Sequence, residues 1–405
     1  MRDAAHDGVR AAVTGVGAVT PLGIGADTLI ERWTRGECGL VDGRGRCELD
    51  PADFLSKNER RRADRYSHLA LVAGAEAVEQ AGWSDGLPYE AERVGCVIGT
   101  GIGGIATIED NHDVMRERGS ERVPPLLIPN MMPNAAAASL AIRHGLGGEV
   151  FGVVSACASG AHAIGAGLRV LAGGGADAVV VGGSEAAVTP LPSAGFDMMG
   201  ATSKCGISRP FDRRRDGFVL GEGAAALVLE HPGTAARRGA EVLAEIVGYG
   251  ATCDAFHLTA PPDDGAAAAR AMRRALDDAG TDLDEVDYIN AHGTSTPLND
   301  RAETVAIKHV MGDHAAGLPV SSTKSVVGHL LGAAGAVDAV VTVEALRRRV
   351  APPTVGLEEP EDGLDLNYVQ GAAQPLPPPE EKPRLIGVSN SFGFGGHNAV
   401  VVMRA

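Results

Sequence analysis

Two stretches of this chain consist almost entirely of small residues, carry few charges and have the composition of α-helices: residues 157–175 and residues 329–347. A helix that is apolar on all sides is stable only in the interior, where other elements cover every face. Glycine also allows neighbouring backbones to approach closely. The chain is therefore predicted to fold around two central, buried helices.

Each of these stretches opens with a chemically capable residue, Cys157 in the first and His329 in the second. If each is the central helix of one half, the chain is a duplicated α/β unit whose reactive ends meet between the halves. The alternative is that small-residue runs recur by chance in a chain with 55 glycines. We predict a first half at residues 8–250, which carries the cysteine, and a second half at residues 251–405, which carries two histidines.

Short apolar runs rich in β-branched residues alternate with alanine-rich stretches, which is typical of α/β proteins with buried strands. Strands are predicted at residues 11–16, 94–99, 150–155, 178–182, 224–230, 245–248, 286–291, 384–389 and 399–403. Helices are predicted at residues 67–81, 135–144, 158–172, 265–279, 300–311 and 332–348.

Composition and charge exclude several functional classes. With 405 residues and 44% hydrophobic content the chain has enough apolar mass for a large core. A net charge of −16 argues against a nucleic-acid partner. It does not exclude an acidic carrier protein as a partner, because the basic runs at residues 60–62 and 213–215 can form local basic patches. The sequence has no uninterrupted run of 18 apolar residues, so no membrane span is predicted. The six cysteines contain no CxxC pair and indicate reduced thiols in a cytoplasm.

Cys157 follows an apolar strand and precedes the first small-residue helix. Unpaired N–H groups and the positive end of the helix dipole meet at a helix N-terminus, and both favour a thiolate. The strand–turn–helix setting also resembles the turn that lifts a nucleophile out of a sheet. The other five cysteines are interpreted as small hydrophobic residues. Cys157 is therefore the candidate nucleophile, and we expect it to be ionised.

Two histidines lie in glycine-rich turns far downstream of this cysteine. His292 is followed by Thr294 and Thr296, which are candidate donors to a polar ligand, although a structural histidine is the alternative. His329 opens a predicted helix, whose N-terminus should lower its pKa and keep the ring neutral, and a neutral ring can donate to an enolate oxygen. Lys324 either tunes these rings or lies on the surface.

The segment at residues 389–398 alternates glycine with phenylalanine. Glycines let a backbone approach a ligand and expose its N–H groups, so this loop is a candidate source of an oxyanion-hole donor. One activated cysteine together with two imidazoles indicates acyl-thioester chemistry.

Together these segments resemble the β-ketoacyl-[acyl-carrier-protein] synthases, the elongating condensing enzymes of the thiolase superfamily. The matching motifs lie in the family's order at residues 154–160, 208–223, 290–296, 322–329 and 390–396. The resemblance implies an α/β, duplicated thiolase-like fold in five layers, α-β-α-β-α, with two mixed sheets and central buried helices. It also implies a homodimer.

The reaction that the resemblance implies is a decarboxylative Claisen condensation. Cys157 takes an acyl chain from the phosphopantetheine arm of an acyl-carrier protein, and malonyl-acyl-carrier protein then binds. His292 and His329 assist decarboxylation, and the carbanion attacks the acyl thioester to give a 3-oxoacyl product. The chemistry needs charge stabilisation at the enolate and no cofactor.

The resemblance also implies roles for other residues. The N–H groups of Cys157 and Phe394 form the oxyanion hole, and Phe394 is the gate between the half-reactions. Thr294 and Thr296 hold pantetheine, and Lys324 and Glu303 form a supporting ion pair. Candidates for the acyl pocket are Ile102, Leu127 and Phe196, of which Leu127 faces a dimer partner. In some relatives the positions of Asn290, Asp338, Ser389 and Asn390 hold a monovalent cation; the alternative is a hydrogen-bonded cluster without metal.

Three features depart from the usual pattern. The stretch at residues 201–208 is shorter than the loop that is usual in the family. His397 follows Phe-Gly-Gly where threonine is common. Residues 299–304 are similar to the catalytic subunit of aromatic or polyene polyketide synthases, whose partner is a chain-length-factor subunit. The sequence is therefore compatible with a role in fatty-acid synthesis or in polyketide synthesis. It is also compatible with a homodimer or with a heterodimer. A coenzyme A thiolase is disfavoured, because it needs a second cysteine in the loop at residues 389–398.

Overall fold

The computed structural model describes residues 11–405; residues 8–10, with which the predicted first half begins, lie outside the described residues. Six strands belong to the N-terminal part: β1 (Ala11–Thr20), β2 (Gly23–Ile24), β3 (Val94–Gly99), β4 (Val150–Val153), β5 (Ala178–Glu185) and β6 (Gly223–Glu230). The C-terminal part contributes β7 (Ala244–Cys253), β8 (Val286–Asn290), β9 (Pro319–Ser321), β11 (Asn367–Tyr368), β13 (Ile386–Gly393) and β14 (His397–Arg404). A separate small pair consists of β10 (Val350–Ala351) and β12 (Gln374–Pro375).

The sheet repeats one topology twice. Its strand order is β11-β9-β8-β13-β14-β7-β1-β6-β5-β3-β4. From β1 outward the pairings to β6 and β5 are antiparallel and those to β3 and β4 are parallel. From β7 outward the pairings to β14 and β13 are antiparallel and those to β8 and β9 are parallel. When the short strands β2 and β11 are left aside, each half has five strands and places its first, fifth, fourth, second and third strands in the same order, which is the pattern of a duplicated unit.

The two predicted sheets are the two halves of one continuous hydrogen-bonded path, because β7 also pairs with β1 over three residue pairs. The predicted division between residues 250 and 251 lies inside β7, and residue 251 is not the start of an element. The second topological unit instead begins with β7 at Ala244. This displacement arises because β7 extends in both directions beyond the four residues predicted as strand.

The helices of the first part are α1 (Ala26–Thr34), α2 (Lys57–Arg61), α3 (Arg65–Gln80), α4 (Ile105–Arg118), α5 (Leu127–Met131), α6 (Ala135–His144), α7 (Ser159–Ala172), α8 (Pro190–Met198) and α9 (Pro232–Arg237). Those of the second part are α10 (Ala266–Ala279), α11 (Pro297–Met311), α12 (Lys324–Val327) and α13 (Ala334–Arg348). None of the helices among residues 11–405 has the length and apolar character needed to cross a membrane.

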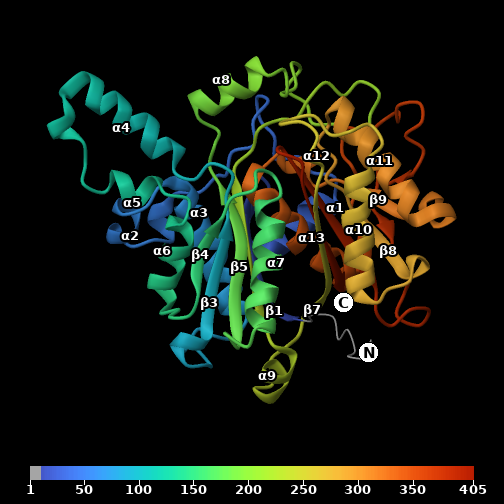
Figure 1. Ribbon diagram of the computed structural model, residues 1–405, viewed down its shortest axis with the longest axis horizontal. Coiled ribbons are helices and arrows are strands. Elements are labelled where there is room, and N and C mark those ends of the chain that lie inside the picture. Colours follow the sequence, from blue (N-terminus) through green and yellow to red (C-terminus); the bar gives the residue numbers. More distant parts are fainter. Residues whose placement is uncertain (1–10) are drawn as a thin grey trace.

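The helices and half-sheets form layers (Figure 1). α3 packs on one face of the β1–β6–β5 half, and α7 packs on β5 and β3 and also contacts α13. α13 contacts strands of both halves, and α10 covers β7 and β14 from outside. The order α3, half-sheet, α7 with α13, half-sheet, α10 confirms the predicted thiolase-like layering with central helices.

α7 and α13 are in direct backbone contact because both carry glycine at the crossing. A Cβ atom on Gly160 of α7 would lie 2.6 Å from the Ala336 nitrogen, and one on Gly335 of α13 would lie 2.7 Å from the Ala161 nitrogen. Every residue from Ala334 to Leu346 is buried. The small-residue composition noted in the sequence is therefore what allows two helices to share the narrow space between the half-sheets.

All nine predicted strands and all six predicted helices are present, most with ends shifted by a few residues. The sequence did not predict the other seven helices of the described residues, α1, α2, α4, α5, α8, α9 and α12, or the short strands β2 and β9 to β12. Two of the missed helices have clear reasons. α4 has a single buried residue, Ile105, and so lacks an apolar stripe, and α8 carries two prolines in its first turn. In Figure 1 α4 extends away from the layered body as part of a protruding arm that also contains α5.

Candidate active site

Cys157 lies in a sharp turn between β4 and α7. Its predecessor Ala156 has φ 50°, a left-handed conformation that is uncommon for a residue with a side chain. α7 begins two residues later, at Ser159, so the cysteine sits just before the helix rather than in its first turn. A Cβ atom on Gly393 would lie 3.0 Å from the Cys157 nitrogen, which explains a glycine at that position of the C-terminal loop.

His329 is in hydrogen-bonding contact with the sulfur. Its Nε2 atom lies 3.0 Å from Sγ of Cys157, and its Nδ1 atom accepts a hydrogen bond from the backbone N–H of Leu331 at 3.3 Å. Because Nδ1 acts as an acceptor, the ring proton of the neutral imidazole is on Nε2 and points to the sulfur. This arrangement brings a donor to the reacting atom.

His292 lies beside His329 on the same cavity. The two ring centroids are 5.5 Å apart and the rings are nearly perpendicular. Both side chains are buried, and burial lowers both pKa values well below the ordinary range, with the nearby charge of Lys324 acting in the same direction. The expected neutral state of His329 is thus supported. Burial is its main cause, since His329 lies five residues before α13 begins.

The expectation that Cys157 is ionised is wrong for this structure. Burial raises the pKa of its thiol to about 11, although hydrogen bonds from the N–H groups of Phe394 and of Cys157 itself and the charge of Lys324 lower it. The apolar surroundings outweigh the favourable effect of the helix N-terminus. The sulfur is therefore held as a thiol at neutral pH, with donors arranged around it for the moment when it becomes charged.

Glu303 and Lys324 do not form the expected ion pair. Lys324 Nζ instead lies 2.8 Å from Oδ2 of Asp338, and both side chains are almost completely buried. The two oxygens of Glu303 accept the backbone N–H groups of His292 and Gly293, each at 2.8 Å. The Glu303 carboxylate accepts hydrogen bonds from the turn that carries His292 and fixes that turn. Lys324 pairs instead with Asp338 on α13.

The side chains of Cys157, His292, Glu303 and His329 line a cavity of about 350 Å³. Nine residues singled out from the sequence line it: Ile102, Cys157, Phe196, His292, Thr294, Thr296, Glu303, His329 and Phe394. The hydroxyl groups of Thr294 and Thr296 are 2.8 Å apart. Residues far apart in the sequence thus meet at one chamber.

Other candidates lie outside the chamber. Lys324, Asn290, Asp338, Ser389 and Asn390 are buried behind it and do not line it. Leu127 belongs to α5, in the protruding arm, and does not reach the cavity of its own chain. The placement of Leu127 in the acyl pocket therefore does not apply within a single chain.

The four positions expected to hold a cation do not fit one through their side chains. Ser389 is in register with Asn290, so the two share the face of the sheet toward Asp338, and Oγ of Ser389 has no hydrogen-bond partner. Asn390 points to the opposite face, where its amide donates to Glu303 at 3.1 Å. The Lys324 ammonium already neutralises Asp338. The alternative, a hydrogen-bonded cluster, is only partly formed: the Asn290 amide donates to the Asp338 carbonyl, while Oγ of Ser389 and Oδ1 of Asn390 have no hydrogen-bond partner.

Two residues that the sequence analysis did not single out are Phe218, on the cavity wall, and Glu185, which is buried behind it. Phe218 lines the cavity and its ring meets that of His329 edge-on, with centroids 5.1 Å apart. Glu185 ends β5 and is fully buried. The available signal for Glu185 was a charged residue at the end of an otherwise apolar strand.

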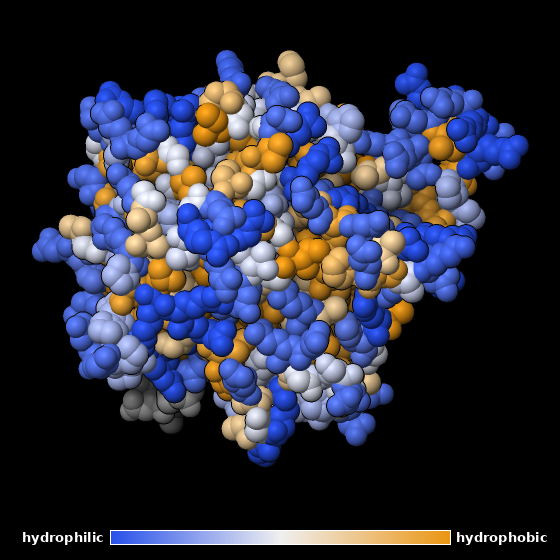
Figure 2. All heavy atoms as spheres, turned by 180° about the vertical axis from the view of Figure 1, so that it is seen from behind, coloured by the Kyte–Doolittle hydropathy of each residue, from blue (hydrophilic) through white to orange (hydrophobic). Residues whose placement is uncertain are grey.

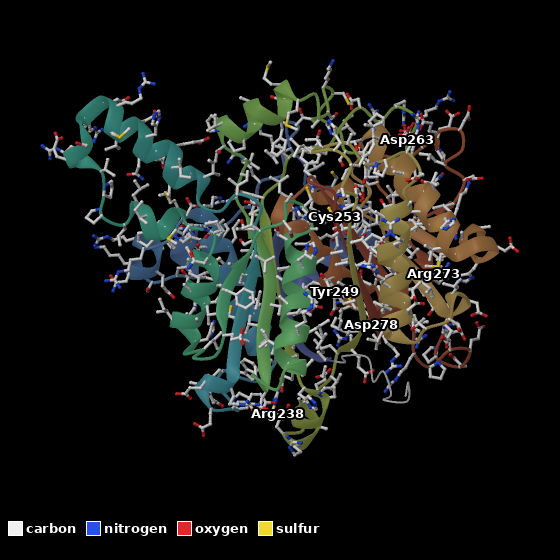
Figure 3. All side chains as sticks on the ribbon, viewed as in Figure 1. Arg238, Tyr249, Cys253, Asp263, Arg273 and Asp278 are labelled. Carbon is white, nitrogen blue, oxygen red and sulfur yellow. The ribbon has the colours of Figure 1, made fainter. Side chains whose placement is uncertain are left out.

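One wall of the cavity comes from the loop after β7. In Figure 3 Tyr249 and Cys253 follow one another along β7, and Asp263 lies beyond them in the next loop. Within that loop Thr259, Ala260, Pro261 and Pro262 line the cavity. The backbone N–H of Gly395 donates to Leu258 at 2.7 Å, so this loop and the loop of Phe394 are joined.

Comparison with known families gives two matches that together cover most of the chain. The family model described as the N-terminal domain of β-ketoacyl synthase matches residues 45–235. The one described as the C-terminal domain matches residues 243–358.

Individual proteins are similar over nearly the whole length. A curated 3-oxoacyl-[acyl-carrier-protein] synthase 2 from Synechocystis sp. is 42% identical over 98% of both chains. The crystal structure of a β-ketoacyl synthase from Burkholderia phymatum STM815 has a TM-score of 0.89 at 34% identity and covers 98% of this chain and 99% of that one. The structure of the ishigamide ketosynthase/chain length factor has a TM-score of 0.87 at 31% identity and covers 97% and 98%.

Proposed function

The chain belongs to the β-ketoacyl synthase family, and on that premise we propose that it joins an acyl thioester to malonyl-acyl-carrier protein with loss of CO₂, giving a 3-oxoacyl-acyl-carrier protein. The observation that supports this most directly is the contact of 3.0 Å between Cys157 Sγ and His329 Nε2, with His292 beside it on one cavity. The reaction serves fatty-acid or polyketide synthesis in the cytoplasm, where the free cysteines would stay reduced.

The first half-reaction loads the cysteine. The sulfur of Cys157 bonds to the acyl carbon, the bond from that carbon to the pantetheine sulfur breaks, and the thiol proton ends on the departing pantetheine. Negative charge on the carbonyl oxygen is stabilised by the N–H groups of Cys157 and Phe394, both of which already act on the sulfur. Thr294 and Thr296 hold the pantetheine arm, because their hydroxyls lie together on the cavity wall.

The second half-reaction makes the carbon–carbon bond. The bond between the malonyl carbon and its carboxylate breaks, CO₂ leaves, and the electron pair forms an enolate. Two neutral imidazoles, on His292 and His329, donate hydrogen bonds to the enolate oxygen. The enolate carbon then attacks the acyl carbon, the bond from that carbon to the sulfur of Cys157 breaks, and the thiolate takes up a proton from water.

The apolar side of the cavity binds the acyl chain. Ile102 and Phe196 pack against a buried apolar cluster that contains Cys157 and Phe218. Phe394 lies in the glycine-rich loop joined to the wall at Leu258, which suits a gate between the two half-reactions.

We propose that the acting unit is a dimer formed across β4. This strand is the outer edge of the sheet path and is only half-buried, and Val154 directly after it is 56% exposed. An exposed edge strand is a surface that pairs readily with another chain. α5 contacts α6, and α6 contacts β4, so Leu127 would lie at the same interface and complete the partner's acyl pocket. Figure 2 shows the arm projecting from the body, with apolar side chains gathered on the face beside it.

The second candidate is a catalytic ketosynthase subunit that works with a chain-length-factor subunit. The likeness to the ishigamide ketosynthase/chain length factor favours it. A homodimer remains the first candidate, because the Synechocystis protein, whose name mentions no second subunit, is 42% identical, against 31% for the ketosynthase/chain length factor.

The test uses the purified chain alone with a panel of acyl-carrier proteins that bear different acyl groups, together with malonyl-acyl-carrier protein. We expect a mass increase of one acyl group on the Cys157 peptide and a 3-oxoacyl product two carbons longer. The Cys157→Gln variant should lose both but keep malonyl decarboxylation, while His292→Ala should lower decarboxylation by about 10²-fold, the scale of losing one oxyanion donor. Product formation only after adding a partner subunit would favour the heterodimer, and turnover with acyl-coenzyme A alone would contradict the proposal.

A further inference from the structure

Glu185 is a buried carboxylate for which the proposed reaction has no use. It ends β5, is 0% exposed and has no ion-pair partner among residues 11–405. Four donors converge on it. Oε2 accepts the N–H groups of Gly101 at 2.6 Å and Gly332 at 3.0 Å, and Oε1 accepts the Thr100 hydroxyl at 3.1 Å and the Ile102 N–H at 3.2 Å.

The donors belong to two segments that meet at the cavity. Gly101 and Ile102 line its apolar side, and Leu331, next to Gly332, lines the side of His329. Leu331 has φ 45°, an unfavourable conformation for a leucine, and its N–H donates to Nδ1 of His329. The same short turn therefore fixes the tautomer of His329 at one residue and binds Glu185 at the next.

The two segments touch through glycines. A Cβ atom on Gly332 would lie 2.1 Å from the Gly101 nitrogen, and one on Gly101 would lie 2.7 Å from Oε2 of Glu185. No side chain fits between the segments, and the carboxylate closes the junction from the β5 side. If either segment moved, it would lose its hydrogen bonds to Glu185, which also binds the other segment.

Glu185 also acts on the sulfur electrostatically. Its negative charge raises the pKa of Cys157, while the charge of Lys324 lowers it. Burial raises the pKa of Glu185 to about 7, and its four hydrogen bonds favour the ionised form. Above pH 7 the carboxylate is therefore largely ionised. The titratable groups that act on Cys157 are then Glu185, Lys324 and the neutral ring of His329.

We propose that Glu185 is a positioning residue, which holds the turn of His329 and the acyl-pocket segment at Thr100–Ile102 in one fixed arrangement through hydrogen bonds to both. The inference rests on the proposed function in that it assigns Cys157 and His329 to acyl transfer. Glu185 links the wall that binds the acyl chain to the turn that carries the ring of His329.

The test is the Glu185→Gln variant, which keeps the size of the side chain but turns one acceptor oxygen into an N–H₂ group facing N–H donors. At pH 8 we expect acyl transfer from acyl-carrier protein to Cys157 to become about tenfold slower, because a buried donor loses its acceptor. In contrast, the midpoint of the pH profile for Cys157 alkylation should move to lower pH, because a negative charge near the sulfur is gone. General loosening of the fold would also hydrate the sulfur and lower the midpoint, so the buried Cys96 must stay unlabelled under the same conditions. This control separates the loss of the Glu185 charge from loosening.

Glu76→Gln is the matched control. Glu76 also accepts two backbone N–H groups, from Ala18 and Ala26, but it lies outside the cavity, so both readouts should stay at the wild-type values. An unchanged transfer rate and alkylation midpoint in Glu185→Gln would overturn the inference. A wild-type protein that takes up no acyl group would overturn the proposed function, while the alkylation midpoint would still decide on Glu185.

Thr100→Val covers the case in which Glu185→Gln does not fold, as judged by circular dichroism. It removes one of the four donors to Glu185. We expect acyl transfer to become slower, though by less than in Glu185→Gln, while the alkylation midpoint stays at the wild-type value because the charge of Glu185 remains. An unchanged transfer rate would overturn the inference.

Discussion

At the scale of single residues, the sulfur of Cys157 is subject to two opposed effects. Backbone N–H groups and a nearby ammonium favour its charged form, and an apolar chamber favours the neutral form. Burial prevails, as it also does at His292 and His329, which it keeps uncharged. The three side chains Cys157, His292 and His329 are thus uncharged at rest, and the hydrogen-bond donors around them act when negative charge develops during the reaction.

Alkylation of the cysteines tests this balance. Iodoacetamide at pH 8 should label the exposed Cys205 and Cys253 before Cys157, because the latter is buried and its pKa is raised to about 11. Labelling of Cys157 should rise as the pH approaches 11. An iodoacetamide with a long alkyl tail should instead prefer Cys157, since the cavity binds the tail. Peptide mass spectrometry distinguishes the sites, and preferential labelling of Cys157 by the plain reagent at pH 8 would show that it is a thiolate.

At the scale of elements, the ends of helices and strands carry the site. Cys157 precedes α7, His292 follows β8, and His329 lies between α12 and α13. α12 is a single short turn, and its position depends on the buried ion pair between Lys324 and Asp338 on α13. The pair therefore fixes the segment that leads to His329.

Breaking this pair should destabilise the fold strongly. Asp338→Asn leaves the Lys324 ammonium buried without a counter-charge, and the free energy of unfolding should fall by about 3–5 kcal/mol. Urea denaturation measures the change. The double variant Asp338→Asn with Lys324→Met should recover part of the loss, because no unpaired charge remains.

The control is a pair on the surface. Arg213 and Glu359 form an ion pair whose side chains are 52% and 64% exposed, so Glu359→Gln should cost less than about 1 kcal/mol. Equal effects of the buried and exposed changes would show that the Lys324–Asp338 pair does not anchor α12.

At the scale of the whole molecule, duplication produces the chamber. Each half-sheet repeats the same strand order, and the central helices α7 and α13 cross between them at glycines. Cys157 comes from the first half and the two histidines from the second, so the reacting groups meet only when both halves are folded together. The first half ends its strand path at the half-buried edge β4.

A charge beside that edge tests the proposed dimer. Val154→Asp places a carboxylate next to β4, three residues before Cys157, and should shift the protein from dimer to monomer and lower condensation together. Val242→Asp is the matched control: Val242 is 46% exposed, lies just before β7 and should leave the dimer intact. Sedimentation velocity measures the state. A wild-type monomer with full activity would contradict the dimer proposal.

The sequence by itself determined the alternation of buried strands with helices, because β-branched runs and alanine-rich runs differ in composition and periodicity along the chain. It also determined the two central helices and the identity of Cys157, His292 and His329 as candidates, since small-residue composition and glycine-rich turns are local signals. It did not predict α4, whose polar surface carries no periodic signal.

Only the tertiary structure decided which charges meet and which groups are ionised. Lys324 pairs with Asp338 rather than Glu303, Cys157 is a thiol, Leu127 lies outside its own chain's cavity, and Glu185 joins two segments of the wall. Each of these depends on distances and burial between residues far apart in the chain. Coulomb interactions and desolvation vary with that three-dimensional environment, which no local pattern of residues encodes.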